Sequence, residues 1–586
     1  MKSFPSFRSR LGAALVRWLK RDGWVMALYA IITVIMTYPV ATQLADHWIA
    51  SRDPDTWMTL WDQWWFAQAI SGKVPFNYTP HLFFPTGVDL TYHSNSWLTS
   101  LLIWLVTPFL GTSGAYNFNI LVAVFTTAYA GYLLIRSIVE HPAAAWLGGI
   151  IYSFLPYHIA HAASHPNLAH LAGIPIAVLL LLRAWSKSSV WSAVGAALTL
   201  GLIALTSLYI LDIAAITLLL VFIGFMFQQH RWRTANFWKI TLIFGVATII
   251  ALAPRLLPLL QSANVLTSAL QQKYDALHLQ TDVMSFVTPS HFNPVFEPYV
   301  SDIASHFEMN KKWPAYLGLI PIVLCLSALT WKKRRGLVLA WTMVGLVFML
   351  MALGPVLRFN GHVYKNLVLP LNYLQDLPPV KVLRPDYFVL GLSLPLAVVA
   401  SFGFDRWLSA LAKRRSASRL LTISVTCLLL FEYWNGPHPG FIDGVSEFYA
   451  QIQNLPGTNA IIDLPMGTGA SKEYMYLQIT HHQPIVEGII GRIPPEAYQY
   501  IQGNALLSLW SSNTPLDCQA IDRVAIKQAL DQLAADNFRF IVVHQPYGNV
   551  PGEFAGYLTS IPIYSDSAIT VFAIADIQAN PPCANH

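Results

Sequence analysis

The chain has 586 residues, of which 55% are hydrophobic and only 11% charged, and its mean hydropathy of +0.46 excludes an ordinary soluble enzyme of this size. The net charge of +6 does not indicate nucleic-acid binding, because the basic residues stand in short clusters between apolar runs. The four cysteines have neither zinc-site nor redox-motif spacing. This composition predicts a polytopic membrane protein.

The N-terminal segment is basic and leads into a first apolar run near residues 24–44 that is long enough to span a bilayer. Since no convincing small-residue cleavage site follows it, we expect an uncleaved signal anchor. Further runs bring the expected number of transmembrane helices to about eleven. They lie near residues 115–135, 142–157, 167–185, 189–207, 209–227, 237–254, 314–331, 337–354, 386–402 and 418–434.

The short run WLTSLLIWLVTPFL, residues 97–110, is edged by tryptophan and is predicted not to span. With that choice, the clusters of Lys and Arg all fall on one side of the membrane, as the positive-inside rule requires. The N-terminus is then cytoplasmic. The predicted membrane domain, residues 1–435, carries outward loops at residues 45–114, 255–313 and 355–385, and a short outward stretch around 158–166.

The tail, residues 436–586, has no spanning run and is predicted to form a small extracytoplasmic α/β domain. The segments NAIIDLP, FRFIVVH and AITVFAI read as short buried strands, and VAIKQALDQLAAD reads as an amphipathic helix. Cys518 and Cys583 either pair or stay as thiols; the sequence favours neither. Asp463 stands at a strand end, and HHQPIVEGIIGR supplies His481, His482, Glu487 and Arg492. These residues could form a site, but a small domain with a few polar loops needs no catalytic explanation.

The stretch SRDPDTWMTLWDQWWF, residues 51–66, follows the first apolar run. Asp55, Thr59 and Asp62 share one helical face, and four tryptophans cover another flank. One reading is a carboxylate that is partly dehydrated by its neighbours and takes a proton from an acceptor hydroxyl. The other reading is an amphipathic interfacial helix whose carboxylates face water.

Histidines recur in the segment PYHIAHAASHPNLAH, at positions 158, 161, 165 and 170. We expect polar groups that hydrogen-bond phosphate or sugar oxygens, with a plain interfacial loop as the alternative. A metal bound by His158 and His161 with Asp53 or Asp55 is only weakly indicated. Basic side chains next to the spans suit a phosphate or anchor to lipid headgroups. They are Arg255, Arg358, Lys381 and Arg384.

The layout resembles the GT-C superfamily of membrane glycosyltransferases: a basic signal anchor, an Asp-bearing outward loop, alternating spans, a large outward loop and a soluble outward tail. More closely, the chain is similar to bacterial YfhO-like multi-pass proteins. The matching stretches run from about residue 37 to 544 and include LFFPTGVDLTYHSNSWLTS, VMSFVTPSHFNPVF, ALGPVLRFNG and VKVLRPDYFVL.

The resemblance implies transfer of a sugar from a polyprenyl-phosphate donor to an envelope glycan, lipid or protein acceptor on the outer face of the bacterial cytoplasmic membrane. The acidic residue of the first outward loop maps onto Asp53 or Asp55. Because the next outward loop carries histidines where many GT-C enzymes have a second acid, we expect a one-carboxylate, metal-free displacement with no cofactor. The expected substrate-binding residues are His93, His158, His161, His165, Arg255, Arg358 and Arg384.

Two other classes of function remain open. A transporter or flippase for a lipid-linked precursor would need polar groups at mid-membrane depth and, often, an internal repeat. Asp212 and Arg183 are among the few charges inside or near the spans, and no repeat is evident, which favours the enzyme. A non-catalytic envelope-assembly protein that holds a partner with its tail is the third possibility.

Overall fold

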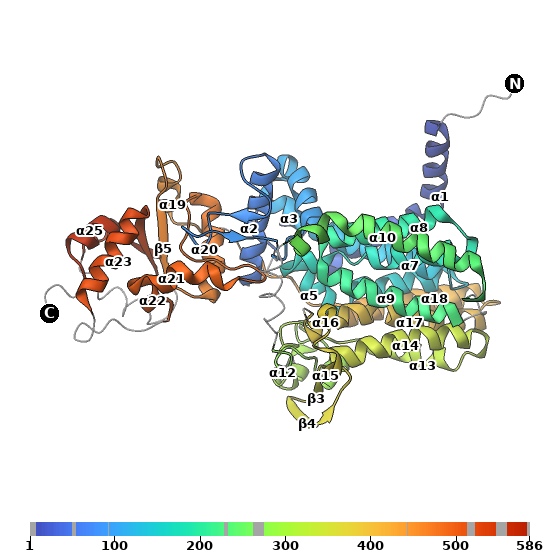
Figure 1. Ribbon diagram of the computed structural model, residues 1–586. Coiled ribbons are helices and arrows are strands. Elements are labelled where there is room, and N and C mark those ends of the chain that lie inside the picture. The colour runs from blue at the N-terminus through green and yellow to red at the C-terminus, as the bar shows by residue number, and fades with distance from the viewer. Residues whose placement is uncertain are drawn as a thin grey trace. The chain divides into compact units, whose positions relative to one another are not determined.

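The computed structural model describes residues 7–49, 54–91, 93–227, 232–261, 275–381, 383–441, 444–512, 522–545 and 560–582. The chain divides into two compact units (Figure 1). The first unit comprises Met1–Ile49, Val106–Arg255 and Lys273–Gly440, and the second comprises Ala50–Leu105, Leu256–Gln272 and Phe441–His586. The division at residue 440 lies close to the predicted boundary at 435, but residues 50–105 group with the tail.

The first unit is helical, and each of the eleven predicted apolar runs overlaps at least one helix. The helices are α1 (Phe7–Met36), α3 (Trp97–Arg136), α4 (Pro142–Phe154), α5 (Pro156–Ser164), α6 (Pro166–Ala169), α7 (Gly173–Lys187), α8 (Val190–Thr206), α9 (Leu208–Phe227), α10 (Ala235–Gln261), α13 (Leu319–Leu329), α14 (Arg335–Ala352), α17 (Phe388–Ala410) and α18 (Arg415–Tyr433). In the described part of the chain, seven helices have the length and composition to cross a membrane, and α4, α8 and α13 are shorter apolar helices. A multi-pass membrane protein is confirmed, while the number of crossings stays a prediction.

The run 97–110 is helical and forms the first part of α3. At Gly111 the backbone leaves the helical region with φ 70° and ψ 177°, so α3 is two helices joined at a kink. Glycine adopts positive φ without the steric cost that a side chain would bring. Whether residues 97–110 enter the membrane stays a prediction.

Close packing in the first unit depends on small residues at helix contacts. Helix α17, whose apolar stretch is buried inside the unit, runs along α13 and α14. A Cβ added at Gly403 of α17 would lie 1.9 Å from the carbonyl oxygen of Leu324 on α13, so only glycine allows this approach. Such small-residue contacts are how membrane helices gain packing where lipid offers no hydrophobic drive.

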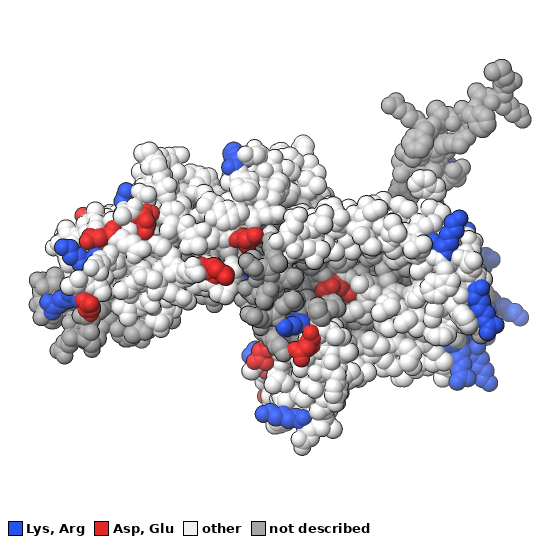
Figure 2. Space-filling view, viewed as in Figure 1, with Lys and Arg blue, Asp and Glu red and all other residues white. Residues whose placement is uncertain are grey.

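Lys and Arg side chains gather at one end of the helices of the first unit, at the right of the view in Figure 2. They belong to the end of α3, the end of α7, and the turns α13–α14 and α17–α18 (residues 136, 183, 187, 332–335 and 413–415). This clustering agrees with the predicted topology, in which the Lys and Arg clusters all lie on one side of the membrane. Orientation in a membrane stays a prediction.

The connections of the first unit carry short elements. They are η2 (Val283–Phe286), α12 (Glu297–Ser305), η3 (Lys332–Arg334), the antiparallel pair β3 (Val356–Phe359) and β4 (His362–Val368), α15 (Leu371–Leu374), α16 (Pro378–Lys381) and η4 (Pro385–Tyr387). All but η3 lie in or beside the loops predicted at 255–313 and 355–385.

The second unit is built around a four-stranded sheet of order β5-β6-β8-β7. Strands β5 (Ala460–Leu464) and β6 (Phe538–His544) are parallel, whereas β8 (Ile569–Ala573) is antiparallel to β6 and to β7 (Tyr564–Ser565). The helices are α2 (Pro54–Ile70), α19 (Glu447–Ile452), α20 (Thr468–His481), α21 (Gln499–Gly503), α22 (Ala505–Ser511), α23 (Arg523–Ala535) and α25 (Ile574–Ala579), with η5 (Pro495–Tyr498) before α21 and the short pair β1 (Tyr78–Thr79) and β2 (Val88–Asp89) after α2. The three predicted strands and the predicted helix are thus present, and the predicted fold class is confirmed.

The first outward loop and the tail share one hydrophobic core. Trp61, Trp65, Leu82 and Phe83 from the loop pack in the same cluster as the buried residues of β5 and β6. Backbone hydrogen bonds join Phe84 N to Ile485 O at 3.1 Å and Ile485 N to His81 O at 2.9 Å. The reading of residues 51–66 as an interfacial helix is therefore wrong for these tryptophans, which are buried in a protein core.

Candidate functional site

Helix α2 carries the carboxylates of the first outward loop. Asp55 lies in its first turn, where the free amide groups of a helix favour a negative charge. Asp53, the other predicted base, lies outside the described residues. The loop from residue 54 to 105 belongs to the second unit, so Asp55 and His93 are described there and the loop histidines and Arg384 in the first unit.

Asp55 is fixed by an ion pair with Lys472 of α20. The Asp55 and Lys472 side chains are 25% and 17% exposed, so the pair is reachable from solvent but mostly covered. The hydroxyl of Thr59 donates to the backbone carbonyl of Asp55 at 2.9 Å and leaves the carboxylate to Lys472. One end of the predicted acidic face is therefore held as a charged pair.

Tryptophans anchor α2 against α20. The indole Nε1 of Trp61 donates to Oε1 of Gln478 at 2.6 Å, and the rings of Trp61 and Trp65 stack at 5.4 Å. Trp57 packs on Tyr476 at 4.5 Å. Because aromatic rings bury large areas and the indole N–H has a partner, these contacts fix the helix that presents Asp55.

A second carboxylate on this helix, Asp62, pairs with His93. Nε2 of His93 lies 2.5 Å from Oδ1 of Asp62, and Nδ1 of His93 accepts a hydrogen bond from the backbone N–H of Gly491 at 3.0 Å. His93 is therefore the tautomer that carries its proton on Nε2. Both ring nitrogens of this predicted substrate-binding residue are occupied within the second unit.

In the first unit, prolines start the helices that carry the loop histidines. Pro156 and Pro166 stand at the first positions of α5 and α6, where a missing N–H costs nothing. His158 is fully buried, and its ring nitrogens lie 2.6 Å from the carbonyl oxygen of Ser153 and 2.8 Å from that of Ala169. Burial lowers the pKa of His158. Its two backbone contacts make it a residue that joins α4, α5 and α6.

His161 has a buried ring nitrogen without a hydrogen-bond partner among the described residues. Its Nδ1 lies 2.9 Å from the carbonyl of Tyr157, and its ring stacks on Trp313 at 4.7 Å. Burial, and next the neighbouring His165, hold the pKa of His161 well below its usual range, so the ring is neutral. Nδ1 then donates to Tyr157, and the buried Nε2, which has no hydrogen-bond partner among the described residues, is left as an acceptor. It suits a hydroxyl rather than a phosphate oxygen.

Arg384 meets the same tryptophan from another segment. Its guanidinium lies 5.1 Å from the ring centre of Trp313 and 4.7 Å from that of Tyr387. Its Nε and Nη2 donate to the two carboxylate oxygens of Asp386 at 3.0 and 2.8 Å. Asp386 also accepts from the hydroxyl of Tyr157 at 3.0 Å. The charge of Arg384 is thus matched by a buried carboxylate.

We call Tyr157, His161, His165, Trp313, Arg384, Asp386 and Tyr387 the Trp313 cluster. His165 completes it, with its ring 5.4 Å from Trp313 and 5.3 Å from His161. The cluster brings together three of the predicted substrate-binding residues, and His158 lies beside it on α5. The cluster thus combines aromatic faces, one fixed cation and a buried imidazole nitrogen that has no hydrogen-bond partner among the described residues.

Two predicted residues lie apart from the cluster's contacts. Arg358 of β3 is buried, pairs with Glu308 at 2.5 Å and donates to the carbonyl of Leu277 at 2.9 Å. Arg255 is buried on α10. Arg358 thus holds the β3–β4 pair to the preceding loop.

The polar residues of the tail form local pairs. Asp463 and His544, on the neighbouring strands β5 and β6, approach at 2.9 Å, and Tyr474 stacks on His544 at 4.4 Å. Glu487 accepts from the N–H of Gly467 at 2.7 Å and from the Ser471 hydroxyl at 2.8 Å, and burial raises its pKa. Cys518 and Cys583 lie outside the described residues. Within the described ranges, no three His, Cys, Asp or Glu side chains gather as a metal site.

Sequence reasoning did not identify Lys472, Trp313 or Asp386. Lys472 and Trp313 stand in segments with no chemical motif, and their roles come from long-range contacts. Asp386 had a signal, since it follows Arg384 by two residues in LRPDYF, a spacing that lets one carboxylate reach the guanidinium.

The model of a protein family described as "Domain of unknown function (DUF6311)" matches residues 25–385, well over half of the chain. The chain belongs to this family. The DUF6311 match covers the predicted first outward loop and the helices from α3 to α14, and it ends before α17 and α18. No curated protein matches the chain by sequence. The closer resemblance to YfhO-like proteins stays a prediction.

Solved structures show the fold of this DUF6311 chain. The oligosaccharyltransferase AglB from Archaeoglobus fulgidus, in complex with an inhibitory peptide and a dolichol-phosphate, is similar with TM-score 0.51 and 12% identity over 90% of this chain and 70% of AglB. ArnT from Cupriavidus metallidurans, bound to undecaprenyl phosphate, is similar with TM-score 0.51 and 11% identity. The match covers 94% of this chain and 98% of ArnT. Arabinofuranosyltransferase AftD from Mycobacteria is similar with TM-score 0.50 and 12% identity over 95% of this chain and 40% of AftD. The predicted GT-C-like fold is confirmed.

Proposed function

We propose that this protein is a membrane glycosyltransferase that moves a sugar from a polyprenyl-phosphate donor to an acceptor on the outer face of the cytoplasmic membrane. One observation carries the proposal: in a chain with a GT-C-like fold, the loop after the first apolar helix forms α2 and holds a carboxylate, Asp55, in a fixed ion pair. The names of AglB and ArnT, solved with dolichol-phosphate and undecaprenyl phosphate, support a lipid phosphate as the carrier.

The proposed reaction is a displacement at the anomeric carbon. Asp53 or Asp55, the positions that the resemblance implies, takes the proton of the acceptor hydroxyl. The acceptor oxygen forms the new bond to the anomeric carbon while the bond from that carbon to the phosphate oxygen breaks. The electron pair of the broken bond leaves with the lipid phosphate. Lys472 keeps Asp55 in place.

Within the first unit, the Trp313 cluster is the proposed place of contact with a sugar. Nε2 of His161 accepts from a sugar hydroxyl, because this nitrogen is buried and lacks a partner among the described residues. Arg384 is held by Asp386 and packs on Trp313, so its proposed role is to position the side chains of the cluster. A contact between Arg384 and the departing phosphate is a second expectation.

The test uses the purified full chain in nanodiscs with synthetic polyprenyl-phosphate sugars and envelope extracts as acceptor. We expect sugar transfer by the wild type and a loss of about 10²–10⁴-fold in whichever of Asp53→Asn and Asp55→Asn removes the base. His161→Phe keeps a ring against Trp313 and should weaken donor binding, seen as a higher KM, with the maximal rate less affected.

Three results would contradict parts of the proposal. Full activity in both aspartate variants removes the base assignment. Donor movement across the membrane without transfer identifies a flippase. Restoration of envelope glycan in a deletion strain by the double variant Asp53→Asn/Asp55→Asn indicates a non-catalytic assembly protein.

A further inference from the structure

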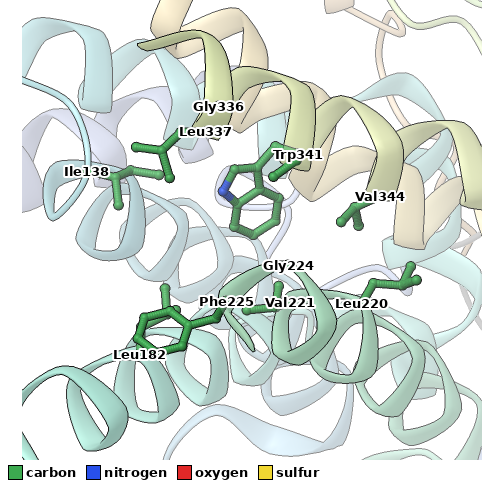
Figure 3. A pocket seen from close by; sticks show the side chains of 11 residues that line it. Ile138, Leu182, Leu220, Val221, Gly224, Phe225, Gly336, Leu337, Trp341 and Val344 are labelled. Carbon is green, nitrogen blue, oxygen red and sulfur yellow. The ribbon is translucent and has the colours of Figure 1, made fainter. Parts of the chain in front are cut away.

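An apolar cavity opens among the helices of the first unit, at the end where the basic residues gather. It has a volume of about 300 Å³ and lies between α7, α9, α14 and Ile138 just after α3 (Figure 3). Leu182, Val221, Phe225 and Trp341 supply much of its wall. The volume is at the lower end of the range of about 300–1,000 Å³ typical of small-molecule sites.

The chemistry of the wall favours an apolar ligand. All the lining residues are aliphatic, aromatic or glycine, and three of the four elements belong to helices with the length and composition of membrane spans. Gly336 and Ala340 on α14 are exposed at its rim. A Cβ at Gly336 would meet nothing within 4 Å, and one at Gly224 would meet only Ala340 at 4.0 Å. The cavity therefore has room at its rim for a hydrocarbon chain.

Two exposed arginines stand next to lining residues in the sequence. Arg183 follows Leu182, and Arg335 precedes Gly336, so each Cα is about 3.8 Å from that of a lining residue. Neither forms an ion pair within the described part of the chain. Their neighbours Lys333 and Arg334, in contrast, both bind Glu140. Figure 2 shows the basic end to which these residues belong.

We propose that this cavity is a binding site for an anionic phospholipid, with a segment of one acyl chain in the apolar cavity and the headgroup phosphate between Arg183 and Arg335. Basic pockets between membrane helices bind anionic headgroups because each Lys or Arg near the surface contributes attraction that a zwitterionic lipid does not receive. The occupant is a phospholipid and not the sugar donor. This site is independent of the proposed transferase activity.

The test is native mass spectrometry of the detergent-purified full chain, delipidated and then mixed with equal amounts of phosphatidylglycerol and phosphatidylcholine that have the same acyl chains. We expect the wild type to retain more phosphatidylglycerol than phosphatidylcholine. The ratio of the two retained lipids should fall about fivefold in each of the variants Arg183→Gln and Arg335→Gln. Because both side chains are exposed, these variants should fold normally.

Two further variants separate the cavity from the charge. Gly224→Leu fills the cavity and should reduce retention of both lipids, whereas Gly224→Ala, whose added methyl group fits, should not. Arg414→Gln/Arg415→Gln removes two exposed cations outside the cavity wall and should leave retention unchanged. Equal retention of the two lipids by the wild type, or an equal loss in the Arg414/Arg415 variant, overturns the proposal.

Discussion

His93 and Asp62 form a hydrogen-bonded pair, with Nε2 of His93 2.5 Å from Oδ1 of Asp62. The other ring nitrogen accepts from the backbone N–H of Gly491 in the tail. His93 thus connects α2 to Gly491, which lies 398 positions after His93 in the chain. A histidine predicted to bind substrate is, in the structure, a connector of the second unit.

Replacing His93 with Ala should destabilise the second unit. The change leaves the Asp62 carboxylate and the Gly491 N–H without this buried partner, which costs about 1–3 kcal/mol. Pulse proteolysis across a urea series measures the loss. The exposed His362 gives a control, since His362→Ala should change little. An unchanged urea midpoint in the His93 variant would show that the pair contributes nothing.

Replacing Lys472 with Met should loosen the first turn of α2. The Met side chain cannot form the ion pair that holds Asp55 to α20. Amide hydrogen exchange in residues 54–62 should therefore become faster, and sugar transfer should fall. Lys472→Arg keeps the cation and should restore both. If Met and Arg variants behave alike, the ion pair does not position Asp55.

Replacing Arg384 with Met should destabilise the first unit by about 3–5 kcal/mol, because Asp386 is wholly buried and loses its compensating charge. The double variant Arg384→Met/Asp386→Asn should recover much of this, since no unpaired charge remains. Thermal unfolding in nanodiscs measures the change, with Lys381→Met, three residues before Arg384, as a control. Additive losses in the double variant would contradict the coupling.

Acidification should destabilise the second unit through His481. Burial, and next the neighbouring His482 and His81, lower the pKa of His481 to about 3 from 6.5. Because the unfolded chain takes up a proton that the folded one does not, this stability is fully present above pH 6.5 and is lost as the pH falls toward 3. The slope is about 1.4 kcal/mol per pH unit.

His481→Gln should flatten this slope, since the amide does not titrate and can still accept from the N–H of Gln483. Urea midpoints of the second unit at pH 7, 6 and 5 give the measurement, and His362→Gln serves as the control. A slope equal to that of the wild type would assign the acid sensitivity to other groups.

The sequence predicted the parts of the fold that rest on local pattern. Apolar runs and strand alternation are local signals, and therefore every predicted span overlaps at least one helix and NAIIDLP, FRFIVVH and AITVFAI form strands. The pairing of residues 50–105 with the tail could not be predicted, because it depends on contacts such as that of Trp61 with Gln478 between distant segments.

The sequence identified several residues of the candidate site but did not predict the role of each one. The sequence picked out His161 and Arg384, which share Trp313, but a pattern does not show which atoms are already bonded. Arg358 and His93 look the same as Arg384 and His161 in sequence, yet their partners Glu308 and Asp62 are found only in the folded chain.

The shared core of the second unit also sets the order of assembly during synthesis. Trp61 and Trp65 leave the ribosome early, but the strands that bury them, β5 and β6, are made only after the last helix of the first unit, α18. Until then, the aromatic side chains of α2 are exposed, and exposed apolar surface makes an incomplete chain prone to aggregate or misfold. A nascent chain that stops after α18 should therefore depend on a chaperone, while the complete chain should not.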